Sequence, residues 1–332
     1  MQNMDRKKIY SILLQISKET GVPVKKIQDM LYILSSGVSV DNTQLIQALG
    51  VSRNALNQVK LLLSKYLKDP SENTQLNAEG EKEIKNMFLD SGYLPEESLF
   101  SLLEDQQYKE TIEFLRSVQK VRPTPNREYD QFIATVETTA KRGALLQFMD
   151  DIEGKRVLFL GDDDFTSVAI AKYKKAEEIT VLDIDKRILG EIGNISIKQN
   201  FGIKTAEYDA RKILPGDFLG KYDVVFTDPP YTPNGIKLFV SRAIEALDTK
   251  NQSARLYLSY GSSDRAKERF IPIYNSLADS GLMLRWVFDK FNRYNGAEAI
   301  GSASSLFICE ATPKIKPLIK GEYKNEDIYT II

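Results

Sequence analysis

The sequence of 332 residues contains no histidine, one cysteine and one tryptophan. Without histidine, no Ser-His or Cys-His nucleophile pair and no histidine-ligated metal site can form. The single Cys309 excludes an intramolecular disulfide and a cysteine-rich zinc site, and its apolar surroundings predict a buried strand thiol. Any general base must therefore be a carboxylate, a tyrosine, a lysine or bound water.

Long apolar runs are missing as well. No stretch approaches the roughly 18 to 20 apolar residues of a membrane span, and the N-terminal MQNMDRKKIY is charged, with no apolar signal core. We therefore expect a cytoplasmic protein without a membrane partner. The net charge of −1 gives no overall attraction to nucleic acid. The length suits two domains, one of them a full α/β sheet domain.

The sequence predicts a winged-helix-like domain at residues 1–100. Apolar residues recur at helical spacing over 9–16, and residues 41–67 predict a short helix, a turn at Gly50 and a longer helix capped by Ser52. This is a helix-turn-helix pattern. The polar stretch that follows would supply a small β-wing.

A winged helix can bind DNA or serve as a packing or dimerisation module. In the first case, Arg53, Asn57 and Lys60 would face the DNA groove. Residues 1–100 contain 12 Lys and Arg and 12 Asp and Glu, so a basic footprint is missing. We therefore expect no nucleic-acid partner, and we expect a homo-oligomer, with a dimer favoured.

Residues 101–332 are predicted to form the catalytic domain. A Pro-containing segment, RPTPNREYDQ, and a helix lead into alternating strands and helices. The candidate strands are 156–160, 179–183, 203–208, 223–228, 255–260, 282–288 and 304–310. The pattern predicts an α/β fold with a doubly wound, mostly parallel, seven-stranded sheet that ends in an antiparallel hairpin. This is the layout of class I methyltransferase-like (Rossmann-like) domains.

Acidic residues follow the first strands of this predicted sheet. Gly161 is followed by Asp162–Asp164, Asp183 lies 22 residues past Gly161, and Asp209 follows the third strand. Ligands of doubly wound sheets bind beyond the carboxyl ends of the strands, where a carboxylate at this spacing meets ribose hydroxyls. We expect Gly161, Asp183 and Asp209 to bind a nucleoside, with Asp209 accepting from an adenine amino group. The alternative for Asp183 is a simple turn residue.

The fourth strand ends in DPPY, residues 228–231, which is similar to the amine-binding turn of amino-methyltransferases. There an acidic or amide oxygen and a proline carbonyl accept hydrogen bonds from the target nitrogen, and an aromatic ring packs beside it. An amine attacks only through a free lone pair, so the site must hold its N–H groups and aim that lone pair. Asp228, Pro229 and Tyr231 are the matching residues.

Three aspartates beside the glycine turn would repel the carboxylate of S-adenosylmethionine. Two unit charges about 5 Å apart interact by roughly 3 kcal/mol at an effective dielectric near 20. The same residues would attract decarboxylated S-adenosylmethionine and polyamines, which are cations. The alternative is that the aspartates cap the following helix, although a helix dipole needs only one carboxylate.

Taken together, these motifs resemble branched-chain polyamine synthases, also called N4-bis(aminopropyl)spermidine synthases. The resemblance rests on the GDDD run at 161–164, VLDIDKR, TDPPYT, RPTPNREYDQ and the N-terminal winged helix. It implies transfer of aminopropyl groups from decarboxylated S-adenosylmethionine to the secondary N4 amine of spermidine, with release of methylthioadenosine. It also implies that the donor is a co-substrate, without a tightly bound cofactor or a required metal.

The resemblance also assigns roles to residues. Asp163, at the middle of the acidic motif, would be the catalytic base, and Asp228 with the Pro229 carbonyl would steer the nitrogen. Asp162 and Asp164 would hold ammonium groups or the tail of the donor.

Two later stretches are weaker candidates. Phe291, Asn292 and Tyr294 would offer aromatic faces to alkylammonium groups, or simply pack. The acidic and aromatic tail at 320–332 would close over the substrate as a lid, or be disordered.

Two other functions stay open from the sequence. One is a DPPY-type amino-methyltransferase acting on nucleic acid, and the other is a winged-helix regulator that senses polyamines and binds DNA. A hard metal ion on the three aspartates is a further alternative.

Overall fold

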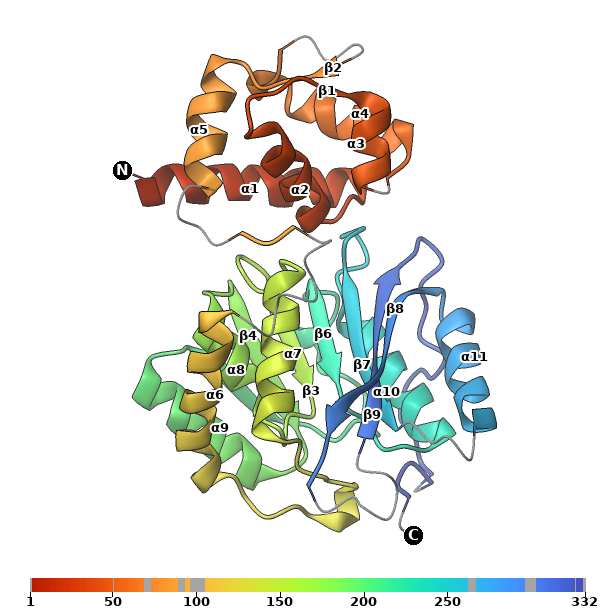
Figure 1. The fold of residues 1–332 in the computed structure, drawn as a ribbon. Coiled ribbons are helices and arrows are strands. Elements are labelled where there is room, and N and C mark those ends of the chain that lie inside the picture. The colour runs from red at the N-terminus through yellow and green to blue at the C-terminus, as the bar shows by residue number, and fades with distance from the viewer. Residues whose placement is uncertain are drawn as a thin grey trace. The chain divides into compact units, whose positions relative to one another are not determined.

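The computed structural model describes residues 2–49, 51–68, 73–88, 93–95, 105–261, 267–295, 303–325 and 327–330. The chain divides into two compact units (Figure 1). The first consists of Met1–Ser101, Phe148–Asp150 and Lys250–Ser253, and the second of Leu102–Gln147, Asp151–Thr249 and Ala254–Ile332. Within the described residues, no helix is both long and apolar enough to cross a membrane.

The N-terminal unit is a helical domain with a two-stranded sheet. Its elements are α1 (Gln2–Thr20), α2 (Val24–Leu34), β1 (Val40–Asp41), α3 (Asn42–Leu49), α4 (Arg53–Leu62), β2 (Asn73–Thr74) and α5 (Ala78–Phe88). Ile9, Leu13 and Ile16 are buried, because their spacing places them on one face of α1. The helix ends before Gly21, whose φ of +70° is a left-handed conformation that suits glycine.

The expected pair of helices corresponds to α3 and α4. The Ser52 hydroxyl caps α4 by accepting a hydrogen bond from the Ala55 N–H (3.2 Å), whereas Gly50 lies outside the described residues. Lys60 does not face a groove: its side chain is buried, and its Nζ donates to Asn42 Oδ1 at 2.6 Å. Of the three residues named for the DNA-binding alternative, Lys60 therefore does not present its side chain to solvent, since α4 packs that face into the domain. The name winged helix stays a prediction.

The second unit is built on a seven-stranded sheet of order β5-β4-β3-β6-β7-β9-β8. The strands are β3 (Arg156–Leu160), β4 (Glu178–Asp183), β5 (Ile203–Glu207), β6 (Val224–Thr227), β7 (Arg255–Gly261), β8 (Leu282–Arg293) and β9 (Ala303–Ala311). The first five pair in parallel, and β9 lies antiparallel between β7 and β8. The predicted doubly wound sheet and its terminal antiparallel hairpin are confirmed.

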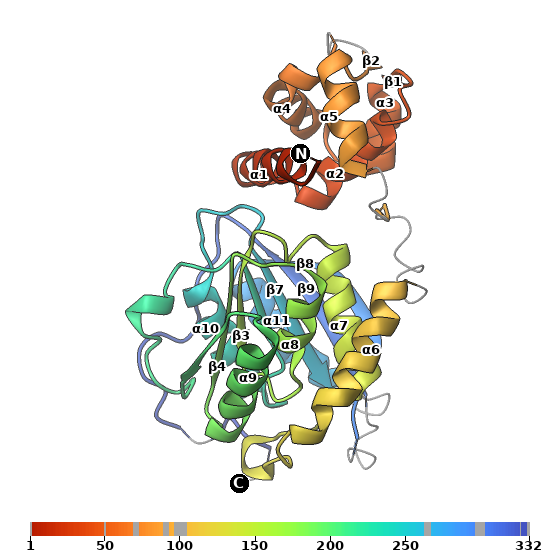
Figure 2. The same ribbon diagram turned by 90° about the vertical axis from the view of Figure 1, so that its left-hand side faces the viewer.

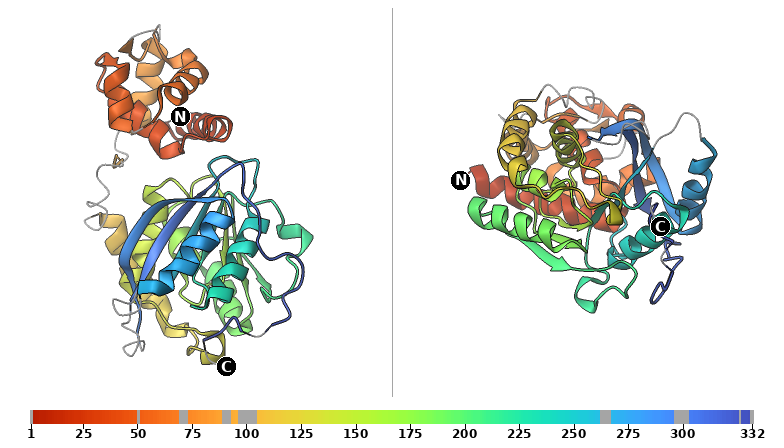
Figure 3. Two further views of the ribbon diagram at one scale, coloured as in Figure 1. Left: turned by 90° about the vertical axis from the view of Figure 1, so that its right-hand side faces the viewer. Right: turned by 90° about the horizontal axis from the view of Figure 1, so that it is seen from below.

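Helices cover both faces of the sheet. They are α6 (Gln106–Val118), α7 (Val136–Phe148), α8 (Thr166–Tyr173), α9 (Lys186–Gln199), α10 (Pro233–Ala246) and α11 (Ile271–Asp279). One face carries α7, α8 and α9, with α6 packed on α8, and the other carries α10 and α11 (Figures 1, 2 and 3). The strand order reverses direction between the neighbouring strands β3 and β6, and α/β sheets bind ligands in the crevice at such a point.

The last hairpin extends farther than the sequence predicted. We expected the sixth strand to end at residue 288, but β8 continues to Arg293 across a register shift between Phe288 and Asn292. Asn292 then pairs with Ser304 on β9. The extension carries Asn292 and the following Tyr294 into the interior beside the ends of β3 and β6, where both are buried.

Candidate active site

A pocket opens at the carboxyl ends of β3, β4, β5 and β6. Its empty volume is about 630 Å³, a figure that includes space open to solvent. The expected residues that line it are Gly161, Asp163, Asp183, Asp209 and Asp228. Parallel strands end at the same edge of a sheet, so residues far apart in the sequence meet there.

Asp163 differs from the other aspartates of the pocket in its contacts with the described residues. No described residue donates a hydrogen bond or forms an ion pair with its half-buried carboxylate, whereas every other aspartate lining the pocket receives at least one donor. Burial and the neighbouring carboxylates, Asp164 first among them, raise the pKa of Asp163 well above its ordinary value. Such a carboxylate has the affinity for a proton that a general base needs near neutral pH.

Asp162 points away from the pocket and caps α8. Its carboxylate accepts hydrogen bonds from the N–H groups of Thr166 (2.7 Å) and Ser167 (3.0 Å). Burial raises the pKa of Asp162 to about 7, although these donors work against the rise. The expectation that Asp162 holds an ammonium group is therefore not met, because the helix N-terminus uses its oxygens.

Asp164 is also turned inward, and it is neutralised by arginine. Its Oδ2 accepts from Arg142 Nη1 at 2.7 Å, its Oδ1 accepts from the Ala134 N–H at 2.6 Å, and Arg122 lies 4.0 Å from it. Only 2% of the residue is exposed. Asp164 does not face the pocket either, because a buried carboxylate is stable only when it is paired and hydrogen-bonded.

The hydrogen bonds of Asp162 to the start of α8 predict that this residue contributes to the stability of the folded protein. We expect Asp162→Ala to lower the free energy of unfolding by about 1 kcal/mol, since the Thr166 and Ser167 N–H groups at the start of α8 lose their acceptor. Denaturant unfolding followed by circular dichroism measures this. Under the original expectation, the variant would instead unfold like the wild type and bind polyamine more weakly.

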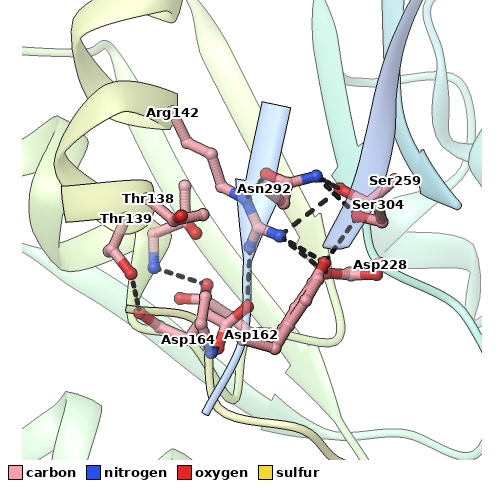
Figure 4. Close-up of polar contacts among 12 residues, drawn as sticks. Thr138, Thr139, Arg142, Asp162, Asp164, Asp228, Ser259, Asn292 and Ser304 are labelled. Carbon is pink, nitrogen blue, oxygen red and sulfur yellow. Dashed lines mark hydrogen bonds and ion pairs between the residues drawn. The ribbon is translucent and has the colours of Figure 1, made fainter. Parts of the chain in front are cut away.

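Asp228 is held in place by three donors. Its Oδ2 accepts from Arg142 Nη2 (2.7 Å) and the Tyr294 hydroxyl (2.6 Å), and its Oδ1 accepts from the Tyr231 hydroxyl (2.9 Å). Burial raises the pKa of Asp228, and the charge of Arg142 opposes the rise. Figure 4 shows the contact between Arg142 and Asp228. The side chain is 15% exposed, so it still reaches the pocket.

Tyr231 and Tyr294 support Asp228 and are not among the residues that line the pocket. Their hydroxyls also lie 3.1 Å apart. Burial and the charge of Asp228 raise the pKa of both phenols well above the ordinary value, so both stay protonated and donate. The expected aromatic face for alkylammonium is thus not offered by Tyr294, which is 8% exposed.

The prolines of DPPY shape the turn after β6. Pro229 and Pro230 are both buried, and Pro230 lines the pocket. The Pro230 carbonyl accepts from the Thr232 N–H at 2.9 Å. No described residue donates to the Pro229 carbonyl, so this oxygen retains its capacity to accept a hydrogen bond.

Asp183 and Asp209 lie where a nucleoside would meet the sheet. Asp183 accepts from the N–H groups of Asp162 (2.9 Å) and Asp185 (2.8 Å), and burial raises its pKa to about 6. Asp209 is partly buried, yet hydrogen bonds from Arg211 hold its pKa below the ordinary value. Each Asp183 oxygen accepts one of these donors and retains a lone pair for a ligand O–H or N–H. Both Asp209 oxygens already accept donors from Arg211, so a ligand would share them with that side chain.

The sequence analysis missed several residues of the site. Tyr129, Asp130 and Gln131 line the pocket. They belong to the RPTPNREYDQ segment, in which the sequence analysis identified no site residue. Gln131 Nε2 donates to Asp185 Oδ2 at 3.2 Å, which ties this segment to the end of β4. Arg142 on α7 was also missed, because nothing in a helical pattern marks one arginine as buried.

The C-terminal tail contributes another wall. Ile328 and Tyr329 line the pocket, and the Thr330 N–H and hydroxyl both donate to the Asp130 carboxylate. Asp327 accepts from Asn234 Nδ2 at 2.7 Å, so it is engaged by the protein. Glu326 lies outside the described residues. Whether the tail acts as a lid stays a prediction.

No group of three or more acidic, cysteine or histidine side chains among the described residues is arranged to hold a metal ion. The Asp164 carboxylate instead forms ion pairs with Arg142 at 2.7 Å and with Arg122 at 4.0 Å.

Comparisons with known proteins agree with the geometry. Residues 110–330 match the model of the branched-chain polyamine synthase A C-terminal domain. An uncharacterized protein of Methanocaldococcus jannaschii is 33% identical over 98% of this chain and 84% of its own length. The N(4)-bis(aminopropyl)spermidine synthase of the same organism is 32% identical over 57% of this chain. That alignment covers 54% of the synthase, or about half its length.

A solved structure shows the same fold. The branched-chain polyamine synthase of Thermus thermophilus, in complex with N4-aminopropylspermidine and 5′-methylthioadenosine, superposes with a TM-score of 0.59. The two chains are 21% identical, and the match covers 95% of this chain and 96% of that one. With two thirds of the sequence matched by the family model and nearly all of it by a full-length relative, the chain belongs to the branched-chain polyamine synthase family.

Proposed function

We propose that this protein transfers aminopropyl groups from decarboxylated S-adenosylmethionine to the secondary N4 amine of spermidine. The products would be branched polyamines and methylthioadenosine. The observation that carries the proposal is the carboxylate of Asp163, which lines the pocket together with Asp228 and has no donor among the described residues.

The chemistry requires one proton acceptor in each round. The N4 ammonium of spermidine loses a proton to Asp163, and the freed lone pair attacks the aminopropyl carbon that is bonded to sulfur. The new C–N bond forms as the C–S bond breaks. Sulfur keeps the bonding electrons and leaves as the neutral thioether of methylthioadenosine. A second round on the tertiary amine gives a quaternary ammonium product.

Asp228 and the Pro229 carbonyl would position the acceptor. Asp228 is held by Arg142, Tyr231 and Tyr294, so its oxygens have a fixed direction. An amine N–H bound to such a fixed acceptor leaves the nitrogen with one orientation relative to the sulfonium. Asp183 would accept from the ribose hydroxyls and Asp209 from the adenine amino group of the donor.

Family members support the choice of substrates. The named synthases of Methanocaldococcus jannaschii and Thermococcus kodakarensis are 32% and 33% identical to parts of this chain. The Thermus thermophilus structure contains N4-aminopropylspermidine and 5′-methylthioadenosine. The relative that aligns along nearly the whole chain has no assigned activity. For this reason the acceptor must be determined for this chain itself.

A DPPY-type amino-methyltransferase acting on nucleic acid is the second candidate function. It is supported by the DPPY turn. The buried Lys60 and the balanced charge of residues 1–100 weigh against a nucleic-acid surface on the N-terminal unit. For that unit we retain the proposals of a winged helix and of a homodimer.

Mass spectrometry of a complete reaction tests the proposal. The purified protein is incubated with decarboxylated S-adenosylmethionine and spermidine, and in parallel with spermine and putrescine. We expect methylthioadenosine and an aminopropylated spermidine that carries the new group on N4. Methyl transfer from S-adenosylmethionine to DNA or RNA, without any aminopropylated polyamine, would reject the proposal.

A further inference from the structure

Arg142 is a fully buried cation that joins two elements of the candidate site. It projects from α7 and is 1% exposed. Its Nη1 donates to Asp164 Oδ2 and its Nη2 to Asp228 Oδ2, each at 2.7 Å (Figure 4). One guanidinium therefore bridges the loop after β3, which carries Asp163, and the DPPY turn after β6.

All three nitrogen atoms of the Arg142 side chain take part in hydrogen bonds. Its Nε donates to Asn292 Oδ1 at 2.8 Å, and Nη2 also contacts the Tyr294 hydroxyl at 3.0 Å. Asn292 in turn donates to Ser304 Oγ on β9 at 2.8 Å. These contacts fix the plane of the guanidinium, which gives Arg142 a geometric role that a point charge such as lysine does not reproduce.

The charge of Arg142 also determines which carboxylate stays free. The groups that act on Asp163 are the carboxylates of Asp164, Asp228 and Asp183 and the guanidinium of Arg122. Those that act on Asp228 are Arg142, Asp164, Tyr294 and Tyr231. Arg142 compensates two of the carboxylates next to Asp163 and makes no bond to Asp163 itself. Without it, Asp163, Asp164 and Asp228 would lose the cation that pairs with two of them. Among the described residues, Arg122 would remain beside this group as a cation.

We propose that Arg142 is a positioning residue that aligns Asp228 with the loop of Asp163, so that amine orientation and proton transfer occur at one fixed geometry. The inference rests on the proposed aminopropyl transfer. Arg142 would touch neither substrate, since it does not line the pocket. Its action would be transmitted through the two aspartates that it holds.

Replacing Arg142 with glutamine tests this role. We expect kcat to fall by about 10²-fold, the order of loss seen when reacting groups are displaced by about 1 Å. The Kd for methylthioadenosine should stay near the wild-type value, because Asp183 and Asp209 do not contact Arg142. Loss of the positive charge raises the pKa of Asp163 and Asp228, so the acid limb of the kcat/KM profile should move to higher pH.

Arg142→Lys separates charge from geometry. Lysine keeps the positive charge but cannot donate to both carboxylates and to Asn292 with a fixed fork. We therefore expect the acid limb of Arg142→Lys to lie near that of the wild type while kcat recovers only in part. Tyr294→Phe, a milder change, removes one donor from Asp228 and should lower kcat and shift the limb in the same direction as Arg142→Gln.

Arg255 provides a matched control. It is also buried, at the amino end of β7, and it pairs with Asp151 at 2.8 Å and with Glu310 at 3.3 Å. Arg255→Gln should lower the unfolding midpoint, as loss of any buried ion-pair partner does. Its kcat and pH profile, measured on folded protein, should match the wild type.

The outcomes distinguish a failure of the proposed aminopropyl transfer from a failure of the positioning role of Arg142. Absence of aminopropyl transfer by the wild type would reject the proposed function. Wild-type turnover with an unchanged kcat and acid limb in Arg142→Gln would overturn the inference alone. If Arg142→Gln does not fold, Tyr294→Phe replaces it as the test. An unaltered kcat and an unaltered acid limb of the kcat/KM profile in Tyr294→Phe would overturn the inference. A limb shift in Arg255→Gln as large as that in the Arg142 variant would do the same.

Discussion

Asparagine in place of Asp163 is expected to lower kcat by about 10³-fold, within the range attributed to a general base. Asparagine has almost the same shape as aspartate but cannot take up a proton at neutral pH. The pocket should keep its form, because Asp163 makes no hydrogen bond to a described residue. Binding of methylthioadenosine, measured by isothermal titration calorimetry, should therefore be nearly unchanged.

The neighbouring Asp162→Asn variant is the control for this experiment. It makes the same chemical change one residue away, in a side chain that caps α8 and does not line the pocket. We expect it to retain turnover on folded protein, since the change lies outside the pocket and the asparagine oxygen still accepts from one of the two N–H groups at the start of α8. Near-normal turnover in Asp163→Asn would remove Asp163 as the base.

Selection of the donor is the second large expected effect. We expect decarboxylated S-adenosylmethionine to bind about 10²-fold more tightly than S-adenosylmethionine, as measured by calorimetry. At a pH above the raised pKa of Asp163, where its carboxyl group is charged, a donor carboxylate about 5 Å away would be repelled by roughly 3 kcal/mol at an effective dielectric near 20. The preference should shrink in Asp163→Asn, which removes the repelling charge.

The structure narrows the origin of this selectivity. From the sequence we expected three aspartates to contribute, but Asp162 and Asp164 are engaged by a helix N-terminus and by arginine. Asp163 is left as the pocket carboxylate without a donor among the described residues. Equal or tighter binding of S-adenosylmethionine would favour the amino-methyltransferase alternative.

The sheet and the location of the site could be predicted because they depend on local patterns. Apolar runs mark the buried strands, and the carboxyl ends of parallel strands meet at one edge. Gly161, Asp183, Asp209 and Asp228 could therefore be assigned to one pocket without knowledge of any long-range contact.

The direction of each side chain could not be predicted in this way. Asp162 and Asp163 are adjacent and chemically identical, but the first completes a helix cap and the second faces the pocket. Asp164, in the loop after β3, is turned inward by Arg142, which lies 22 residues earlier on α7. Such pairings arise from tertiary packing, and helical periodicity does not encode them.

Tyr294 illustrates the same limit at the end of a strand. The sequence placed it in a loop, since polar residues follow the apolar part of the strand at 282–288. The observed β8 continues through a register shift, and Tyr294 becomes a buried donor to Asp228. A bulge of this kind depends on the partner strand, here β9, and on space in the interior.

Titration of the Asp163 carboxyl group is the most direct measurement of the central claim. Carbon-13 NMR of aspartate-labelled protein, recorded without ligand, should show a carboxyl carbon that titrates well above the ordinary aspartate pKa of about 3.9. That resonance should be missing from the spectrum of Asp163→Asn, which assigns it. A resonance of Asp163 that titrates at or below the ordinary value would show that its carboxylate is compensated after all, and would contradict its role as the proton acceptor.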